Sequence, residues 1–591
     1  MRRTVVLAVL ASLAVLPLRL AASAPLQRPG DPVEITGDSV PTLIGILPGA
    51  LVAWRYRGGW QQIPVQVDER DFRDLATIYN EAPSGPVESV YTDPGTYTGP
   101  DTDPTLDADD EIVFMVEEAG DLSPDFGLPP HVIAGTGVEI AVIDPVDAGV
   151  GFVYLFRQDG TLDPGAGRTF GSYDFVLLAG QYPQDYNLLN GPNPEDTTVA
   201  TPFYSHHFSD RWIDDGLRIL AGDATGVDIL DRHKSQFAPG DCSRSENTFS
   251  AGEGCFIVNK SGAVRGIRSY MGANSGVLTQ REHLFYERRH DIRTFVRVHQ
   301  ISGLVSYFDY TPEAIGMTYR NDGNTGGVPI DGSPDVVAAG VLGWELVEGG
   351  QGSLIIVHGF DTDIPGLTPT SYYLDSNATR PPVQQCTGDP WAYGSSGPWF
   401  HGAIPCTDPV TCPQYFYRFT IFRTLYYEAP GATVADAAAR AQRRDTPLGI
   451  IVSAWPPPSP LSVPADSSEG IPLTVRLDPA NPQTLDLSWG KSCDAAVTVG
   501  YAIYGGALGD FDSHVPIICL VPATTVIISL NASGPVTFGN QNAWLPPAGS
   551  NYYLVVPVST EAEGSYGTDS QGNERPASTM ACKPSRPGHC P

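Results

Sequence analysis

Hydrophobic and polar residues alternate over short stretches in most of this chain. Runs rich in Val, Ile, Tyr and Phe, such as residues 51–56, 111–115 and 293–299, are separated by turns drawn from 63 glycines and 54 prolines. Such runs predict β-strands, because the side chains of a strand point alternately to the two faces of a sheet. Helical periodicity is almost absent. We therefore expect an all-β protein, with a large multi-sheet β-sandwich and few helices.

One segment has a helical pattern, and it follows Gly431. Thr433 can cap residues 434–444, and the arginines at the end of this stretch complement the helix dipole. We expect this helix to close the large domain. The proline-rich, polar residues 456–470 come next and predict a linker between two domains.

The first residues have the pattern of a signal peptide. Met1, Arg2 and Arg3 precede an apolar run, residues 5–16, and small residues lead up to Ala24. The apolar run is shorter than the about 20 residues that a membrane-spanning helix needs. We expect cleavage of residues 1–23 and a secreted or cell-surface protein without a membrane span.

The mature chain is expected to contain three folded parts. Residues 24–160 would form an N-terminal β-subdomain that carries an acidic loop, and residues 161–455 a large β-sandwich domain. Residues 471–591 resemble a fibronectin type III module. Residues 485–489 end in Trp489, which resembles the tryptophan of the second strand in that family, and Tyr552 or Tyr553 resembles the tyrosine of its penultimate strand. The resemblance implies a C-terminal immunoglobulin-like β-sandwich.

Charge and cysteine content narrow the functional classes. The chain has 67 acidic and 35 basic residues, a formal net charge of −32, which disfavours nucleic acid as a partner. Nine cysteines form no Cys-x-x-Cys pair, so in an exported protein they predict disulfides. We expect Cys242 to pair with Cys255 and Cys386 with Cys406 or Cys412, with one thiol left over.

The clearest local motif is an acidic loop directly before a predicted strand. Residues 101–111 hold six carboxylates, and hard cations such as calcium need six to eight oxygen ligands. The motif predicts a calcium site; the alternative is a solvated acidic turn. The expected ligands are Asp101, Asp103, Asp107, Asp109 and Glu111.

A basic strip has the opposite character. Seven arginines fall within residues 265–297, and alternation over residues 293–299 places on one strand face Arg293, Phe295, Arg297 and His299. Arginine binds carboxylates bidentately, so the strip predicts an anionic or sugar-rich ligand. The alternative is that these arginines pair with acidic residues of the fold itself.

A second resemblance suggests an activity. Residues 60–68 followed by 109–114, and Gly262–Ala–Val–Arg265 leading into long strands, are similar to secreted sugar-processing proteins with mutarotase-like and β-supersandwich polysaccharide lyase domains. This resemblance implies β-elimination on an acidic, uronate-containing polysaccharide. The catalytic candidates are His283, Tyr286 and His290. The substrate-binding candidates are Arg281, Arg289, Arg293, Arg297, His206 and His207.

A non-catalytic glycan- or protein-binding protein, stabilised by calcium and disulfides, is the rival interpretation. It explains the composition and the C-terminal module without an active site. A lyase would need histidine, tyrosine and arginine to converge in one open groove, whereas a binding protein would not. Other hydrolase motifs are missing: no Gly-x-Ser-x-Gly elbow accompanies residues 357–360, and no phosphate loop occurs.

Overall fold

The computed structural model is built almost entirely of strands. It describes residues 26–78, 82–123, 127–179, 192–222, 226–240, 242–273, 278–378, 385–456, 473–478, 481–494, 496–525, 527–531, 536–538, 541–543, 551–568 and 573–588. Within these ranges three segments are α-helical, namely α1 (Leu75–Ile78), α2 (Glu246–Ala251) and α3 (Val434–Asp445). The prediction of an all-β protein with few helices is confirmed. The expected signal peptide and nearly all of the expected linker lie outside the described residues.

The chain divides into two compact units. The larger unit consists of Ala24–Gly120 and Ala141–Ile451, and the smaller unit of Asp121–Ile140 and Val452–Pro591 together with the N-terminal residues that the structure does not describe. The expected division of the larger unit into a part before residue 160 and a part after it stays a prediction. Each unit is described by itself.

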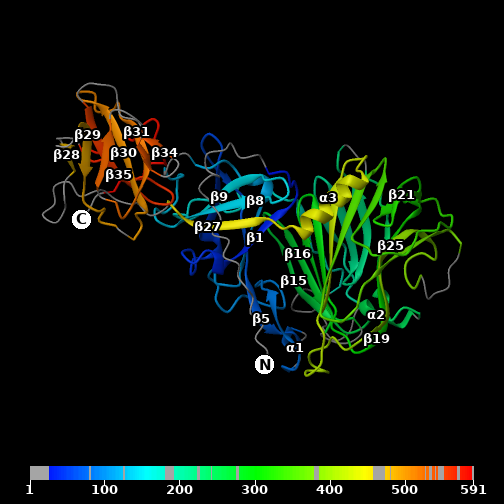
Figure 1. Ribbon diagram of the computed structural model, residues 1–591. Helices are drawn as coiled ribbons and strands as arrows, with labels where there is room; N and C mark the ends of the chain where they lie inside the picture. Colours follow the sequence, from blue (N-terminus) through cyan, green and yellow to red (C-terminus); the bar gives the residue numbers. More distant parts are fainter. Residues whose placement is uncertain are drawn as a thin grey trace. The chain divides into compact units, whose positions relative to one another are not determined.

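A nine-stranded antiparallel sheet is the centre of the larger unit (Figure 1). Its strand order is β15-β16-β17-β18-β26-β23-β22-β20-β21. The bounds are β15 (Cys255–Ser261), β16 (Gly266–Met271), β17 (Gln280–Phe285), β18 (Arg289–Phe295), β26 (Phe419–Glu428), β23 (Gly352–Thr362), β22 (Trp344–Gly349), β20 (Thr318–Asn321) and β21 (Asn324–Pro329).

Two four-stranded sheets cover one face of this sheet, which we call the inner face. Buried Phe208 of β12, Ile292 of β18 and Phe308 of β19 belong to one apolar cluster, so the core lies between the layers. The first of these sheets contains β10 (Ser172–Asp174), β11 (Thr197–Ala200), β12 (Tyr204–Asp210) and β13 (Ile213–Ile219); the second contains β14 (Leu230–Phe237), β19 (Ile301–Tyr310), β25 (Ala392–Ile404) and β24 (Thr370–Ser376).

N-terminal strands cover part of the other face, which we call the outer face. Val113 of β7 packs with Ile267 of β16 and Leu284 of β17. These strands form the sheet β1 (Pro32–Thr36), β7 (Glu111–Met115), β4 (Gln66–Asp68), and near them in sequence lie β2 (Leu51–Tyr56), β3 (Trp60–Ile63), β9 (Val150–Arg157), β5 (Arg70–Asp74) and β6 (Val87–Tyr91). Two of the boundaries between the units fall within strands, namely β8 (Gly137–Ile143) and β27 (Gly449–Trp455).

The helix α3 covers a second part of the outer face. Its Ala437 packs against Trp344 and Val357 of β22 and β23. Thr433 and Asp436 form a reciprocal capping box at its start, so the predicted cap is confirmed. Between α3 and the N-terminal strands, grooves open on the outer face of β18 and β26.

The smaller unit contains a compact β-sandwich. One sheet has the order β28 (Thr474–Asp478), β29 (Asn481–Ser488), β32 (Ile527–Asn531); the other has the order β31 (Val515–Pro522), β30 (Gly500–Ala507), β35 (Asn551–Val558); β33 (Val536–Phe538) and β34 (Gln541–Ala543) form a hairpin. Buried Trp489, Tyr501 and Ile518 form its core. The sandwich is the predicted class of fold, and membership of the fibronectin type III family stays a prediction.

The disulfides correct the predicted pairing. Cys242 is bonded to Cys386, with Cα atoms 5.3 Å apart, and Cys406 is bonded to Cys412. Cys255 is the free thiol of the described residues: it begins β15 with its side chain in the apolar core, away from the loop that holds Cys242. In the smaller unit Cys519 is bonded to Cys582. The predicted pairs of Cys242 with Cys255, and of Cys386 with Cys406 or Cys412, are therefore wrong, because they were chosen by closeness in the sequence.

Candidate functional site

The basic strip divides between the two faces of the nine-stranded sheet. Along β18, Arg289, Asp291 and Arg293 project from the outer face, and His290 and Thr294 project from the inner face. The predicted alternation agrees with this over residues 293–296, where half-buried Arg293 and Phe295 alternate with buried Thr294 and Val296. It does not continue beyond them, because β18 ends at Phe295 and Arg297 is as buried as its neighbours. The candidate residues therefore do not converge on one site.

The two candidate catalytic histidines meet on the inner face. Nδ1 of His283 lies 2.9 Å from Nε2 of His290, and the other ring nitrogen of His283 lies 3.0 Å from the Tyr270 hydroxyl. Both side chains are fully buried, and burial holds the pKa of each well below its ordinary value. These imidazoles are neutral core groups without contact to solvent.

Other members of the candidate set lie beside this pair. His206 of β12 contacts the Asp214 carboxylate at 3.1 Å and the Tyr427 hydroxyl at 2.7 Å. Arg281 donates to the hydroxyls of Thr294 and Ser235, and its guanidinium stacks on Trp212 at 4.5 Å. Each is buried, so the arrangement is a polar network inside the sandwich.

His207 follows His206 in β12 and projects to the opposite side. Its ring lies between two carboxylates, Asp215 at 2.7 Å and Asp196 at 3.1 Å. The hydrogen bond to Asp215 raises the pKa of His207 to about 9. The sequence pair His206–His207 is thus split by strand alternation.

Tyr286 lies between the nine-stranded sheet and the N-terminal strands. Its hydroxyl donates to Glu34, and Arg265 donates to Glu34, Asp68 and Glu111 around it. Both Tyr286 and Arg265 are fully buried. For Arg265 the alternative holds, because this arginine pairs with carboxylates of the fold itself.

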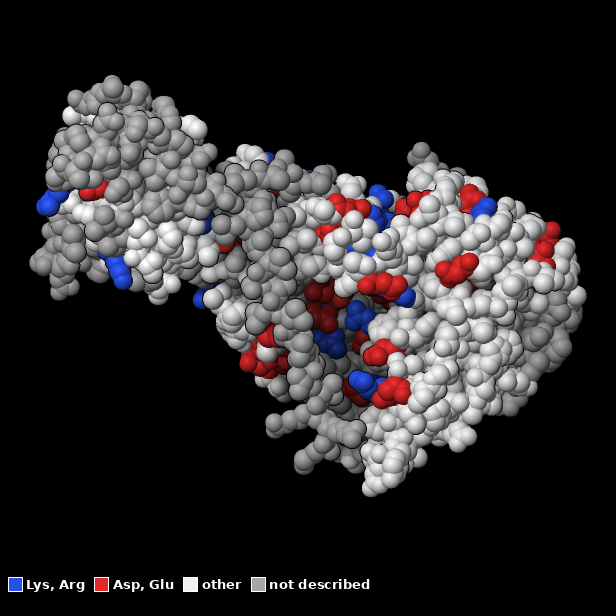
Figure 2. Space-filling model, in the orientation of Figure 1, with Lys and Arg blue, Asp and Glu red and all other residues white. Residues whose placement is uncertain are grey.

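The outer groove is the open feature of the basic strip. It consists of three adjoining pockets on the outer face of β18 and β26, with volumes of about 280, 570 and 470 Å³. Arg289, Thr424 and Arg444 line both the first and the second pocket, and Phe295 lines both the second and the third. The three pockets therefore adjoin in a row: the first two lie between β1 and the end of α3, and the third lies at the ends of β18 and β26 beside residues 85–88 and 407–410. Figure 2 shows acidic and basic side chains gathered in a hollow on the face of the molecule in view.

Three predicted arginines reach this groove, each beside a carboxylate. Arg289 pairs with Asp291 at 2.8 Å and with Asp31 at 3.1 Å. Arg293 lies 3.3 Å from Glu34, and Arg297 lies 3.1 Å from Glu88. Their side chains are between 10% and 22% exposed, so they are accessible at the groove wall but already paired.

The sequence did not point to several groove residues. Phe360, Phe422 and Arg444 line the second pocket and come from β23, β26 and α3. The strands β18, β26 and β23 are brought together by pairing: Phe422 of β26 lies opposite Arg293 of β18 on one side and opposite Gly359 of β23 on the other. Alternation within each strand gives the face, but only the sheet order shows which strands are neighbours.

The acidic loop links two pairs of its five predicted ligands through the backbone. Asp101 accepts from the backbone of Asp103, and Asp107 accepts from the backbone of Asp109. Burial and the neighbouring Asp107 raise the pKa of Asp109 to about 6, and one Asp109 oxygen is buried without a hydrogen-bond partner. Glu111 instead pairs with Arg70 and Arg265. The aspartates have the chemistry that calcium requires, and the site stays a proposal.

Comparisons with known proteins give weak structural similarities. No family model matches the chain, and no curated protein matches it. An α-mannosidase from Enterococcus faecalis V583 is 11% identical, with 79% of this chain and 49% of that protein covered at a TM-score of 0.34. A putative aldose 1-epimerase from Escherichia coli K12 is 12% identical (39% and 98% covered, TM-score 0.24), and a heparan sulfate lyase from Pedobacter heparinus is 9% identical (56% and 42%, 0.21). Values this low assign neither a family nor an activity.

In the described residues, no helix has the length and apolarity that a membrane crossing requires. The larger unit holds two disulfide bonds and the smaller unit at least one. Disulfides are typical of proteins outside the reducing cytosol, which agrees with the expected location.

Proposed function

We propose that this is a secreted glycan-binding protein whose ligand, an acidic polysaccharide, lies along the outer groove. The observation that supports this most directly is the shape of the groove: three adjoining pockets, open to solvent, follow β18 and β26. An elongated open groove suits a chain molecule, whereas a small compact ligand would need a single closed pocket.

The chemistry of the wall suits a uronate-containing chain. Besides Arg423, whose guanidinium lies on the inner face, five arginines line the first two pockets: Arg28, Arg289, Arg293, Arg443 and Arg444. Four carboxylates line them as well, in a chain whose net charge is −32. Guanidinium groups can bind sugar carboxylates, and the phenyl faces of Phe295 and Phe422, which project from the outer face, can pack on sugar rings.

Binding without turnover is the better supported form of this proposal. A β-elimination needs a base and an acid within hydrogen-bond reach of the substrate. Among the described residues that line the three pockets, none is a histidine; the tyrosines are Tyr417 and Tyr426, and the buried Tyr426 hydroxyl donates to Asp31. His283, Tyr286 and His290 are all buried away from the groove. Their catalytic roles stay predictions, and the geometry favours the non-catalytic alternative.

Calorimetric titration with a uronate-rich polysaccharide tests the proposal. We expect binding that weakens as the salt concentration rises, and much weaker binding of a neutral glucan of equal length, because salt screens exposed charges. The same mixture is monitored in the near ultraviolet for the unsaturated product of elimination. Binding without absorbance supports the proposal. Absorbance that grows with time would show a lyase, and no binding to either polymer would refute a glycan function.

A further inference from the structure

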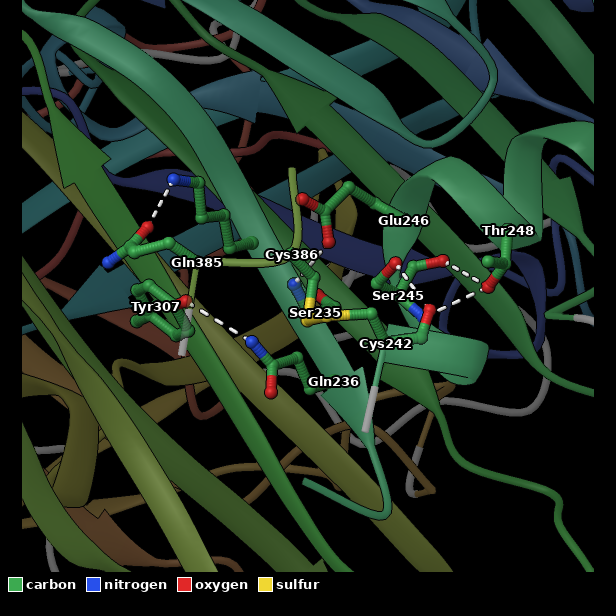
Figure 3. The surroundings of a disulfide bond; sticks show 10 residues. Ser235, Gln236, Cys242, Ser245, Glu246, Thr248, Tyr307, Gln385 and Cys386 are labelled. Carbon is green, nitrogen blue, oxygen red and sulfur yellow. Dashed lines mark hydrogen bonds between the residues drawn. A yellow bond between two sulfur atoms is a disulfide. The ribbon is translucent and has the colours of Figure 1, made fainter. Parts of the chain in front are cut away.

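Lys234 of β14 is a buried lysine surrounded by acceptors. Its side chain is 1% exposed, and its Nζ contacts the Asp309 carboxylate, lies 3.0 Å from Asp231 and donates to Gln385. The strands β14 and β19 pair antiparallel with His233 opposite Phe308, so Lys234 and Asp309 are diagonal neighbours on one sheet face. Gln385 adjoins Cys386, whose disulfide to Cys242 holds this segment beside β14 (Figure 3).

The carboxyl group of Asp309 has the surroundings of an activated acyl group. Its Oδ2 faces Lys234, whereas its Oδ1 accepts from the Ser395 hydroxyl and from the backbone N–H of Tyr393 at 3.3 Å. Two donors on one oxygen stabilise the negative charge that develops there during nucleophilic attack on a carbonyl carbon. Burial raises the pKa of Asp309 to about 7, which makes its protonated form accessible near neutral pH. Although burial opposes it, Asp309 and Asp231 raise the pKa of Lys234, so the neutral pair is the minor form.

Further carboxylates lie close to the pair. One oxygen each of Asp231, Asp309 and Asp389 lies within 4.8 Å of the others. Such a cluster could in principle hold a metal, but the Lys234 ammonium already lies among these oxygens as their counter-ion. Asp231 is 3.0 Å from the Lys234 nitrogen and can accept a proton from it.

We propose that Lys234 and Asp309 become joined in the folded protein by an intramolecular isopeptide bond between Lys234 Nζ and Asp309 Cγ. The geometry supplies a nucleophile, an acyl group, two oxyanion donors and a proton acceptor in one buried cluster. Such a bond would tie β14 to β19 covalently. It is independent of the glycan groove.

The reaction needs no external reagent. Proton transfer from Lys234 to Asp309 gives a neutral amine and a neutral carboxylic acid. The Nζ–Cγ bond forms, Asp231 takes one proton from Nζ and passes it to Oδ2, and the Cγ–Oδ2 bond breaks with release of one water molecule. Asp231 is restored. Each molecule reacts once, so a minor population of the neutral pair is sufficient.

A second lysine–aspartate pair, with a buried carboxylate and a lysine that is 20% exposed, provides an internal control. Lys260 lies 2.7 Å from Asp68, but Arg265 also contacts this carboxylate at 2.8 Å. Although burial opposes it, Lys260 and Arg265 lower the pKa of Asp68 to about 2. An ionised carboxylate is a poor acyl group, so we expect no bond between Lys260 and Asp68.

Peptide mapping by mass spectrometry, after reduction and alkylation of the disulfides, tests the inference. We expect a branched peptide that contains both Lys234 and Asp309 and is lighter than its two parts by one water, and linear peptides at Lys260 and Asp68. The Lys234→Arg variant keeps the charge but cannot form the amide, so its peptides should be linear. Asp231→Asn, which removes the proton acceptor, should leave a large unreacted fraction.

Linear peptides of full mass at Lys234 and Asp309 in the native protein would overturn the inference. This result decides the matter even if the variants fail to fold, because it uses the unmodified chain. A branched peptide at Lys260 and Asp68 as well would show that contact alone causes the bond, and would overturn the role assigned to Asp231, Ser395 and Tyr393.

Discussion

At the scale of single residues, His207 gives the stability of the protein a pH dependence. Its pKa of about 9 lies above the ordinary value of 6.5, because Asp215 stabilises the charged ring. A raised folded-state pKa contributes stability that is fully present below about pH 6.5 and is lost as the pH rises through about 9. We expect the melting temperature of His207→Gln to depend less on pH than that of the native protein between about pH 6.5 and 9. Equal slopes for the variant and the native protein would contradict the assignment.

The pair Arg268–Glu195 gives a second prediction at this scale. Both side chains are fully buried, and two guanidinium nitrogens bind the two carboxylate oxygens. Glu195→Gln would leave a buried guanidinium without its counter-charge, so we expect a loss of about 3–5 kcal/mol in the free energy of unfolding, measured with urea. Glu313→Gln, the same substitution at an exposed position, is the control and should change it by less than about 0.5 kcal/mol.

Alternation along a strand is the part of the site that the sequence could predict. It places Arg293 and Phe295 together and separates them from Thr294, as observed. The partners across the sheet could not be predicted, because Glu34, Phe422 and Arg444 lie far from Arg293 in the chain. The contact between Lys234 and Asp309 also joins residues far apart in the chain, so the sequence could not predict it. Nor could the sequence show which arginines pair with carboxylates of the fold.

At the scale of elements, the acidic loop predicts a calcium response. We expect millimolar calcium to raise the melting temperature near neutral pH, because binding to the folded state alone stabilises it. The response should shrink as the pH falls through the Asp109 pKa of about 6, since protons then compete for the carboxylates. Asp107→Ala should abolish the shift, and Asp163→Ala, in a separate acidic turn, should preserve it. An unchanged melt with calcium would leave the loop a solvated turn.

Elements with local signals were predicted well. The capping residues Thr433 and Asp436 lie within one turn of each other, so α3 could be placed from the sequence. The disulfide of Cys242 could not, because its partner is 144 residues away and is brought near by the sheet that contains β14, β19 and β25. Long-range strand pairing therefore limits what local patterns can show.

At the scale of the whole molecule, we expect the C-terminal sandwich to fold independently. It has its own buried core around Trp489 and Tyr501. Limited proteolysis within residues 457–472 should release a fragment that begins near residue 473 and melts cooperatively. As a control, reduction of the fragment should lower its melting temperature, because the disulfide between Cys519 and Cys582 lies within it. Release of only unfolded peptides would contradict an independent sandwich.

The central claim, that the outer groove binds an acidic polysaccharide, is tested most directly by titrating a uronate oligosaccharide into matched variants. Arg293→Met removes a guanidinium from the groove wall, whereas Arg55→Met removes one of similar exposure that pairs with Glu118 outside the groove. We expect Arg293→Met to weaken binding by about 10-fold and Arg55→Met to leave it unchanged, because a hydrogen bond to a charged group contributes about 1.5 kcal/mol. Equal affinities for the two variants, or no binding by the native protein, would contradict the account.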